Sequence, residues 1–399
     1  MSARVPLHER FARAALAVLT ALTACIAGAA DATLTLLWSV PQPGVPLPAP
    51  LTLEDATSPT QGALALLARE RAGYVVLAGG GAAGPGIIGH SEPAAVLTRI
   101  VGGGRDLLWV GGRVGQRAFG SGADVPDAYL MKLNHEGRLA GEYVFHSGRP
   151  RAIEDLFALP AGEVLLSGRD GNEAWLAKIS AAGALVWQQR FGLGKGSAVI
   201  ALGNRILVAA IDVAQREDKR YQEDLTVWSF DATGKPLDKQ LVRPGLADMP
   251  TSQALSLALL AAGDAAYVVS SSADLVRPRP LQVSRVRSNG SPVGYVTLEG
   301  SIAQRDSRST ALCEHAQVVL ENGDLLVACA SDALIRLYRL AASDGAVTES
   351  SVALPQCHKG RAPALFLFKP ENGTVWLLGS HKGGTLGAGC TWLGVLALS

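Results

Sequence analysis

The sequence predicts an all-β fold built from one repeated four-stranded unit, and three observations point to it. First, one hairpin recurs along the chain; its clearest copy is Glu173–Gly192, in which a short apolar strand meets a turn that Gly183 closes. Second, short apolar runs follow a glycine from Gly73 to Gly373 at a step of about 50 residues. Third, no helical apolar period persists after the first thirty residues. This pattern predicts a β-propeller, because radial stacking covers both faces of each short sheet.

The further copies of the hairpin set the predicted number of blades. They are Asp127–Gly137, Leu225–Gly234, Val283–Gly290 and Ile335–Gly345. Seven four-stranded blades account for the interval from Gly73 to Gly373. Six and eight blades stay open, because Gly79–Gly89 carries no clear hairpin and Ala95–Ile100 reads either as an inner strand or as a hairpin remnant.

The two ends of the predicted domain, residues 31–399, resemble the two strands of the recurring hairpin. Residues 33–40 read as its second strand and Thr391–Ser399 as its first. The N-terminal strand is therefore expected to complete the last blade and to close the ring. The prolines between Pro41 and Pro50 predict a rigid surface connector.

Residues 1–30 predict a signal peptide that precedes the fold. Its basic residues are Arg4, Arg10 and Arg13. The apolar run Ala14–Ala24 is too short to span a bilayer. Ala27–Ala29 is one cleavage site, whereas Leu22–Cys25 resembles the bacterial lipobox, in which the cysteine carries the lipid. Either alternative predicts a periplasmic or secreted protein, anchored to a membrane if Cys25 is acylated.

The four remaining cysteines are an even set, which suits an oxidising compartment. They are Cys313, Cys329, Cys357 and Cys390. Histidines lie nearby in sequence, but no spacing typical of a zinc site is present, so disulfides are preferred over metal. The expected strand directions bring Cys313 opposite Cys329 and Cys357 near Cys390, which predicts those two disulfides.

Composition excludes some functions. The formal net charge is +1 and 18% of residues are charged, which gives no argument for nucleic-acid binding. No second apolar run is long enough to span a membrane, so membrane contact is expected only through a lipid on Cys25. No cofactor and no metal site are predicted.

The hairpin sequence resembles a known group of repeats. The pattern acidic-Ala-aromatic-Leu-x-Lys-hydrophobic, then Gly, then Leu-x-Trp resembles the β-propeller repeats of secreted bacterial proteins over residues 127–192. Phe230–Lys235 resembles one turn of the quinoprotein-type repeat, including the outer-membrane assembly lipoproteins built on it. The docking tryptophan of that repeat is replaced here by Leu237 and Asp238. The resemblance implies a fold and a place outside the cytoplasm, and it transfers no catalytic residue.

One set of residues is a candidate binding site. Segments that link consecutive blades open onto one face at the mouth of the central channel, and several of them carry basic residues. These are Arg149, Arg151, Lys195, Arg243, Arg305, Arg308, His358, Lys359 and Arg361. The set predicts either ordinary solvated loops or a basic channel mouth that binds an anionic small molecule or an acidic protein surface.

The sequence favours an exported, non-catalytic β-propeller that binds a protein partner or scaffolds a complex of the bacterial envelope. No nucleophile elbow, zinc-protease motif or phosphate loop is present. The alternatives are a propeller enzyme, a hydrolase or lyase, and a small-molecule binder that uses the channel mouth. Carboxylates and histidine gathered at one end of the channel would favour the enzyme.

Overall fold

The computed structural model describes most of the chain beyond residue 31. The described residues are 32–40, 52–57, 63–70, 73–80, 86–90, 95–103, 107–115, 126–134, 138–215, 221–248, 252–274, 281–298, 312–321, 323–330, 334–355, 363–369, 374–381 and 391–398. The predicted signal peptide with Cys25, the proline-rich connector, and five basic residues and two cysteines fall outside them. Those seven residues are Arg305, Arg308, Cys357, His358, Lys359, Arg361 and Cys390.

All the elements of the described residues are β-strands, arranged in antiparallel sheets. One sheet contains β2 (Thr52–Thr57), β3 (Ala63–Glu70), β4 (Gly73–Gly80) and β5 (Gly86–His90); the next contains β6 (Ala95–Gly102), β7 (Leu107–Val114), β8 (Asp127–Asn134) and β9 (Leu139–Phe145). A larger sheet contains β10 (Arg151–Ala158), β11 (Val164–Asp170), β12 (Glu173–Ile179), β13 (Leu185–Leu202), β14 (Arg205–Gln215), β15 (Tyr221–Asp231) and β16 (Pro236–Asp248). Then come β17 (Ser252–Ala262), β18 (Ala265–Asp274), β19 (Leu281–Arg287) and β20 (Pro292–Leu298), followed by β21 (Leu312–Glu321), β22 (Asp324–Ala330), β23 (Leu334–Leu340) and β24 (Val347–Ala353). The last sheet contains β25 (Pro363–Phe368), β26 (Val375–His381), β27 (Thr391–Leu398) and β1 (Ala32–Val40).

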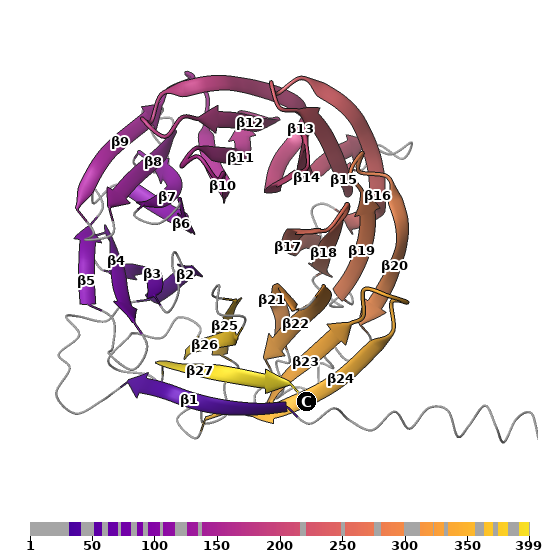
Figure 1. Ribbon diagram of the computed structural model, residues 1–399. Coiled ribbons are helices and arrows are strands. Elements are labelled where there is room, and N and C mark those ends of the chain that lie inside the picture. The colour runs from indigo at the N-terminus through magenta and orange to yellow at the C-terminus, as the bar shows by residue number, and fades with distance from the viewer. Residues whose placement is uncertain are drawn as a thin grey trace, which may run out of the picture.

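The sheets stand side by side around a common centre (Figure 1). In each sheet the first strand lies innermost and the fourth lies on the rim, which is the arrangement of a β-propeller. The 18-residue strand β13 joins two groups of four strands, because its first part pairs with β12 and its second part with β14. Residues 95–102 form β6, the first strand of its sheet, so the inner-strand interpretation of that segment is correct.

The N-terminal strand β1 pairs with the C-terminal strand β27 along its whole length. The register runs from Ala32 opposite Leu398 to Val40 opposite Thr391. The predicted pairing of these two segments is therefore present in the sheet β25-β26-β27-β1.

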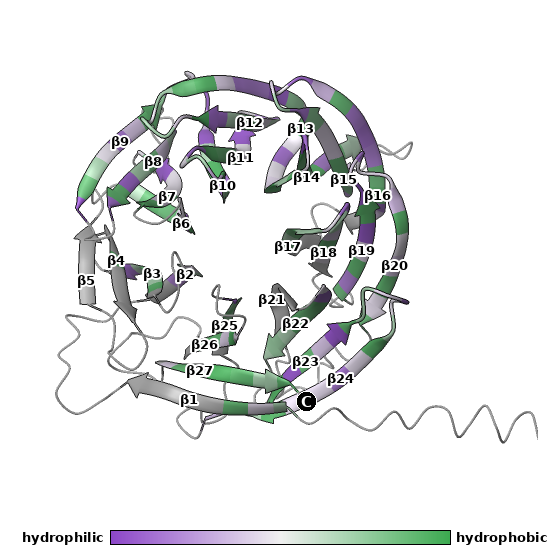
Figure 2. Cartoon of the chain, in the orientation of Figure 1, coloured by the Kyte–Doolittle hydropathy of each residue, from purple (hydrophilic) through white to green (hydrophobic). Residues whose placement is uncertain are grey.

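Apolar side chains hold consecutive sheets together. One buried cluster joins Trp109 and Leu130 of the β6–β9 sheet to Ile153 and Trp175 of the following strands. Similar clusters join the β13–β16 strands to the β17–β20 sheet, and the β21–β24 sheet to the sheet of β25–β27 and β1. Outer strands such as β9 and β16 carry both hydrophobic and hydrophilic residues (Figure 2). The core is thus a series of interfaces between sheets, as stacked propeller blades require.

Two turns closed by glycine leave room for an aromatic ring from the preceding group of four strands. Gly234 closes the turn after β15 with a φ of +84°, and a Cβ there would lie 2.5 Å from Cε3 of Trp187 on β13. Gly183 has a φ of +86°, and a Cβ there would overlap the ring of Tyr143 on β9. Glycine is needed at these two turns both for its backbone conformation and for the close approach of the ring. Trp187 therefore packs between the β10–β13 strands and the turn that follows β15.

Candidate functional site

The four described members of the predicted basic set do not form one open cluster. Arg149 is exposed, and its Nη1 lies 3.2 Å from Oε2 of Glu173. Arg243 on β16 donates from Nη1 to the backbone oxygen of Ser270 at 3.3 Å and to its Oγ at 3.2 Å. Lys195 lies half-buried within β13. Arg243 thus links neighbouring sheets, which is a structural task.

Arg151 is buried rather than presented to solvent at the mouth. Its side chain is 4% exposed, and its Nη2 lies 2.6 Å from Oδ2 of Asp170, which is fully buried. The guanidinium also lies over the ring of Trp175, 4.6 Å from the ring centre. The sequence places Arg151 among surface loop residues, but it begins β10 beside the last residue of β11, and this pairing buries its charge.

Asp170 receives several charge-assisted hydrogen bonds. Besides Arg151, it accepts from Nε of Arg190 at 2.6 Å and from Oγ of Ser147 at 2.8 Å. Burial opposes the charged form, but the hydrogen bonds from these three side chains outweigh it and hold the pKa of Asp170 below its ordinary value. This network connects strands β10, β11 and β13, so it supports the fold and leaves no free nucleophile or base.

A second polar network lies on the innermost strands, where the sequence reading did not find a site. Oδ2 of Asp55 on β2 accepts the backbone N–H of Ile100 on β6 at 2.9 Å. Arg99 on β6 donates from Nε to Oδ1 of Asp155 on β10 at 3.3 Å. Oδ2 of Asp155 accepts the N–H of Val199 on β13 at 2.9 Å. Three carboxylate and guanidinium groups therefore connect four successive inner strands.

A bulge recurs in the inner strands and explains why these residues are placed alike. The register shifts between Leu53 and Asp55, between Leu97 and Arg99, and between Ile153 and Asp155. A bulge turns the following side chain away from the regular ladder. The acidic and basic residues after the bulges can therefore reach across to the next sheet. The sequence signal is a charged residue within a strand, isolated in the case of Arg99 and preceded by a glutamate in the cases of Asp55 and Asp155, and it does not indicate the partner.

Burial sets the pKa of the two carboxyls in this inner network. Desolvation raises the pKa of Asp55 to about 6, although the charge of Arg99 and the N–H groups of Ile100 and Ala56 act in the opposite direction. Desolvation likewise raises the pKa of Asp155 against the attraction of Arg99. For Arg99, the charges of Asp55 and Asp155 outweigh desolvation, so its pKa is raised and it stays charged.

We expect Asp55→Asn to remove part of the pH dependence of stability. An unfolded aspartate has a pKa of about 3.9, whereas folded Asp55 has a pKa of about 6. Between these values the folded chain binds more protons, so the free energy of unfolding should fall as pH rises from about 4 to about 6. In the variant this fall should be smaller. Urea unfolding at a series of pH values measures it, and an unchanged slope would contradict the assigned burial.

Cys329 is disulfide-bonded and buried. Its partner side chain lies outside those that the structure describes. Leu312 pairs with Ala330 on the antiparallel strands β21 and β22, and the register shifts before Gln317 pairs with Ala328. The pairings Cys313–Cys329 and Cys357–Cys390 stay predictions, which peptide mapping without reduction would check.

The described part of the chain contains no group of three or more His, Cys, Asp or Glu residues that could hold a metal ion. Nor is there, in the same residues, a helix with the length and apolar character needed to cross a membrane. Nδ1 of His146 lies 2.6 Å from Oδ2 of Asp127, on the surface at the ends of β8 and β9.

The outer strand β20 is the clearest exposed feature of the described surface. It forms the edge of its sheet and pairs with β19 alone. Val293 is 52% exposed and Tyr295 is 70% exposed. Its sequence, PVGYVTL, has no charged residue, which it shares with the edge strands β1 and β5, whereas the outer strands β9, β13, β16 and β24 each contain at least one. Charges commonly protect an edge strand from pairing with another chain, and β20 lacks this protection.

Comparisons with known proteins show similarity to propeller structures at low sequence identity. No protein-family model matches the sequence, and no curated protein matches it. The C-terminal WD40 domain of Sif2 is 10% identical, with 91% of this chain and 98% of that chain covered and a TM-score of 0.47. A chain from a structural study of two prolyl endopeptidases is 13% identical, with 88% of this chain and 50% of that chain covered and a TM-score of 0.44. At these TM-scores, the propeller assignment rests on the strand order of the chain itself.

Proposed function

We propose that this chain is an exported, non-catalytic β-propeller that binds a partner protein in the bacterial envelope. The observation that carries the proposal is the uncharged, exposed edge of β20. The buried ionic groups described above are bound to one another and to backbone amides across the sheets, so they act in support of the fold. The export part of the proposal rests on the sequence of residues 1–30.

The propeller has seven blades in this proposal. Four-stranded sheets and the long strand β13, shared by two groups of four strands, support that count. Closure by β1 is supported by its pairing with β27 and by the proximity of β2 to β25 on the inner side. Radial stacking then leaves the outer strands as the edges open to another chain.

The partner adds an extended segment beside β20. Backbone hydrogen bonds to the free edge provide affinity in this mode of recognition, and alternate side chains provide specificity. Tyr295 and Thr297 lie on one face of the strand because they are two residues apart, and exposed Val293 stands at a bulge beside them. The exposed side chains of Val293, Tyr295 and Thr297 supply apolar surface and two hydroxyl groups, which suits a partner segment rich in β-branched or aromatic residues.

A photo-crosslinking residue tests this assignment in the native host. With p-benzoyl-phenylalanine in place of Tyr295, irradiation should join the chain to one defined partner of the cell envelope. The matched control replaces Glu349 on β24, an exposed residue of the next outer strand that pairs with Arg336. The control should give at least tenfold less of that product. Val293→Lys combined with the crosslinker at Tyr295 should abolish the product, because a charge on the edge opposes strand addition.

Equal crosslinking from both positions, or none from either, would contradict binding at β20.

The cellular location of the protein is tested separately by mass spectrometry of its N-terminus in the native host. An intact Met1 on soluble cytoplasmic protein would contradict export. Palmitate labelling that is lost in Cys25→Ser would identify the lipidated form.

A further inference from the structure

In five groups of four strands, one row of three residues crosses the second, third and fourth strands at an equivalent register. The rows are Trp109–Lys132–Gly141, Leu165–Lys178–Trp187, Leu207–Ser229–Asp238, Tyr267–Arg285–Gly294 and Leu326–Arg339–Thr348. Because the sheets repeat, these rows show how each sheet fills the same space beside its neighbour.

Three of these rows include an aromatic side chain, which lies on the fourth strand in the row of Trp187 and on the second strand in the rows of Trp109 and Tyr267. Trp187 packs against the turn of Gly234. Trp109 is buried with the ammonium of Lys132 5.4 Å from its ring centre, and Tyr267 is buried in its own row. The row of Leu207 contains an ion pair instead, in which Nη1 of Arg205 lies 3.1 Å from Oδ2 of Asp238.

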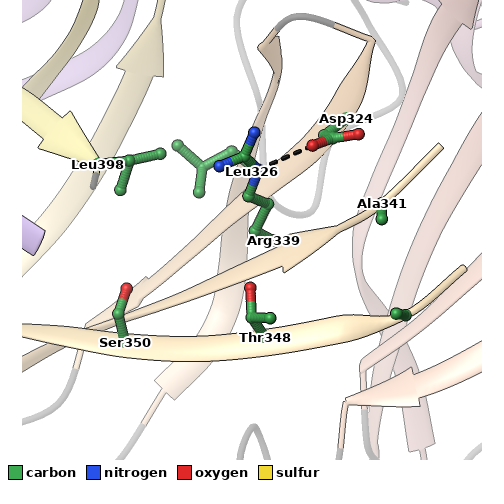
Figure 3. Close-up of a pocket in the computed structure, with 8 residues that line it drawn as sticks. Asp324, Leu326, Arg339, Ala341, Thr348, Ser350 and Leu398 are labelled. Carbon is green, nitrogen blue, oxygen red and sulfur yellow. Dashed lines mark hydrogen bonds and ion pairs between the residues drawn. The ribbon is translucent and has the colours of Figure 1, made fainter. Parts of the chain in front are cut away.

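The row of the β21–β24 sheet has no aromatic residue, and a pocket of about 310 Å³ lies there. Figure 3 shows Leu326, Arg339 and Thr348 around it, with Ser350 farther along β24 and Leu398 on the opposite side. Leu398 belongs to β27, and no turn joins β27 to β1 at this end, because these strands come from opposite ends of the chain. In the β10–β16 strands the turn of Gly234 and the ring of Trp187 occupy the equivalent place, whereas among the described residues of this sheet the pocket lies there.

The ion pair and the turn beside this pocket correspond to those beside Trp187. Arg339 Nε lies 2.8 Å from Oδ2 of Asp324, and at the equivalent position Lys178 Nζ lies 2.8 Å from Oε2 of Glu163. The turn after β23 is one residue longer than the turn after β12, with N–H donation from Ala341 to Ala346 at 2.9 Å and from Ser180 to Ala184 at 2.8 Å, and a bulge in the β12–β13 pair restores the same register. At the position equivalent to Trp187, the β21–β24 sheet has Thr348, which provides no indole ring.

We propose that this pocket binds the indole ring of a tryptophan from a partner protein. The inference rests on the proposed function and names the chemistry of the partner. Leu326 and Leu398 supply apolar walls, and Arg339 supplies a cation for the face of the ring. The hydroxyl groups of Thr348 and Ser350 are acceptors available to an indole N–H. The chain thus takes from a partner the group that Trp187 provides within its own β10–β13 strands.

Binding of N-acetyl-tryptophanamide and of free indole to the full chain tests the proposal by ligand-observed NMR. Both probes should bind the natural protein. Thr348→Trp copies Trp187 and should reduce binding at least tenfold. Ser350→Tyr copies Tyr143, which lies two residues after Gly141 on β9 as Ser350 lies two residues after Thr348 on β24. It should also reduce binding at least tenfold and serves as the test if Thr348→Trp does not fold. Trp187→Thr should create a second site, so the number of bound probes should rise. Circular dichroism checks that each variant is folded.

Absence of binding to the natural protein, or equal binding to both filled variants, would overturn the proposal. Binding of free indole without N-acetyl-tryptophanamide would also overturn it, since the pocket would then accept a small molecule and not a side chain. These results are independent of crosslinking at Tyr295. Probe binding without a crosslinked partner would contradict partner binding at β20 and support indole binding in the pocket. A crosslink without probe binding would support partner binding at β20 and contradict indole binding in the pocket.

Discussion

A chain that lacks Thr391–Ser399 is expected not to fold. β27 lies between β26 and β1, so its loss removes two ladders of its sheet. It also removes Trp392, Leu393 and Leu396, which are all buried against neighbouring strands. Each buried side chain of this size contributes about 1.5–3 kcal/mol. The sum is comparable to the whole stability of a domain, about 5–15 kcal/mol.

The matched control removes residues 32–40 instead. β1 lies at the rim and pairs with β27 alone, so its loss should lower the melting temperature and leave a folded chain. Thermal unfolding followed by circular dichroism, with sedimentation to detect aggregates, compares the two truncations with the full chain. An unchanged melting temperature after loss of Thr391–Ser399 would show that the stability of the fold does not depend on these strands.

The strand pattern was predictable because it depends on neighbours in sequence. Gly183 and Gly234 end hairpins whose apolar residues alternate, and a hairpin needs only its own turn and two strands. The pairing of residues 33–40 with the C-terminal strand was predictable for the same reason, since both segments repeat parts of the hairpin. Local periodicity therefore carries most of the fold.

The polar contacts between sheets were not predictable in this way. Asp55, Arg99 and Asp155 belong to three different inner strands, and bulges decide that they face one another. Arg151 was placed in a surface set from its position between two predicted strands. Its burial depends on Asp170, nineteen residues later in the sequence and beside it only once β10 and β11 pair.

The pocket beside Thr348 illustrates what the repeats add once the structure is known. A threonine in an outer strand has no unusual sequence signal. That Thr348 occupies a position filled elsewhere by an aromatic ring becomes evident only when Trp187 is found at the same register in another sheet. Equivalent positions in a repeat protein therefore act as internal controls, because each sheet shows what the others contain or lack at that place.

Asp170→Ala is expected to destabilise the folded chain by about 3–5 kcal/mol, because it leaves the buried guanidinium of Arg151 without its partner. Glu173→Ala is the matched control. It removes the partner of Arg149 in an exposed pair nearby, and it should change stability by only about 0.2–1 kcal/mol. Urea unfolding near neutral pH measures both variants. Similar small effects from the two would contradict a buried ionic network.

The same network predicts a pH dependence opposite in sign to that of Asp55. The lowered pKa of Asp170 means that its contribution is fully present above the ordinary aspartate pKa of about 3.9 and is lost as pH falls through the lowered value. Asp170→Asn cannot be charged, so its free energy of unfolding should fall less steeply below about pH 4 than that of the natural protein. Asp55→Asn should leave this acidic limb in place and flatten the region between about 4 and 6. If Asp170→Asn leaves the acidic limb unchanged, the hydrogen bonds from Arg151, Ser147 and Arg190 do not hold the carboxylate in its charged form.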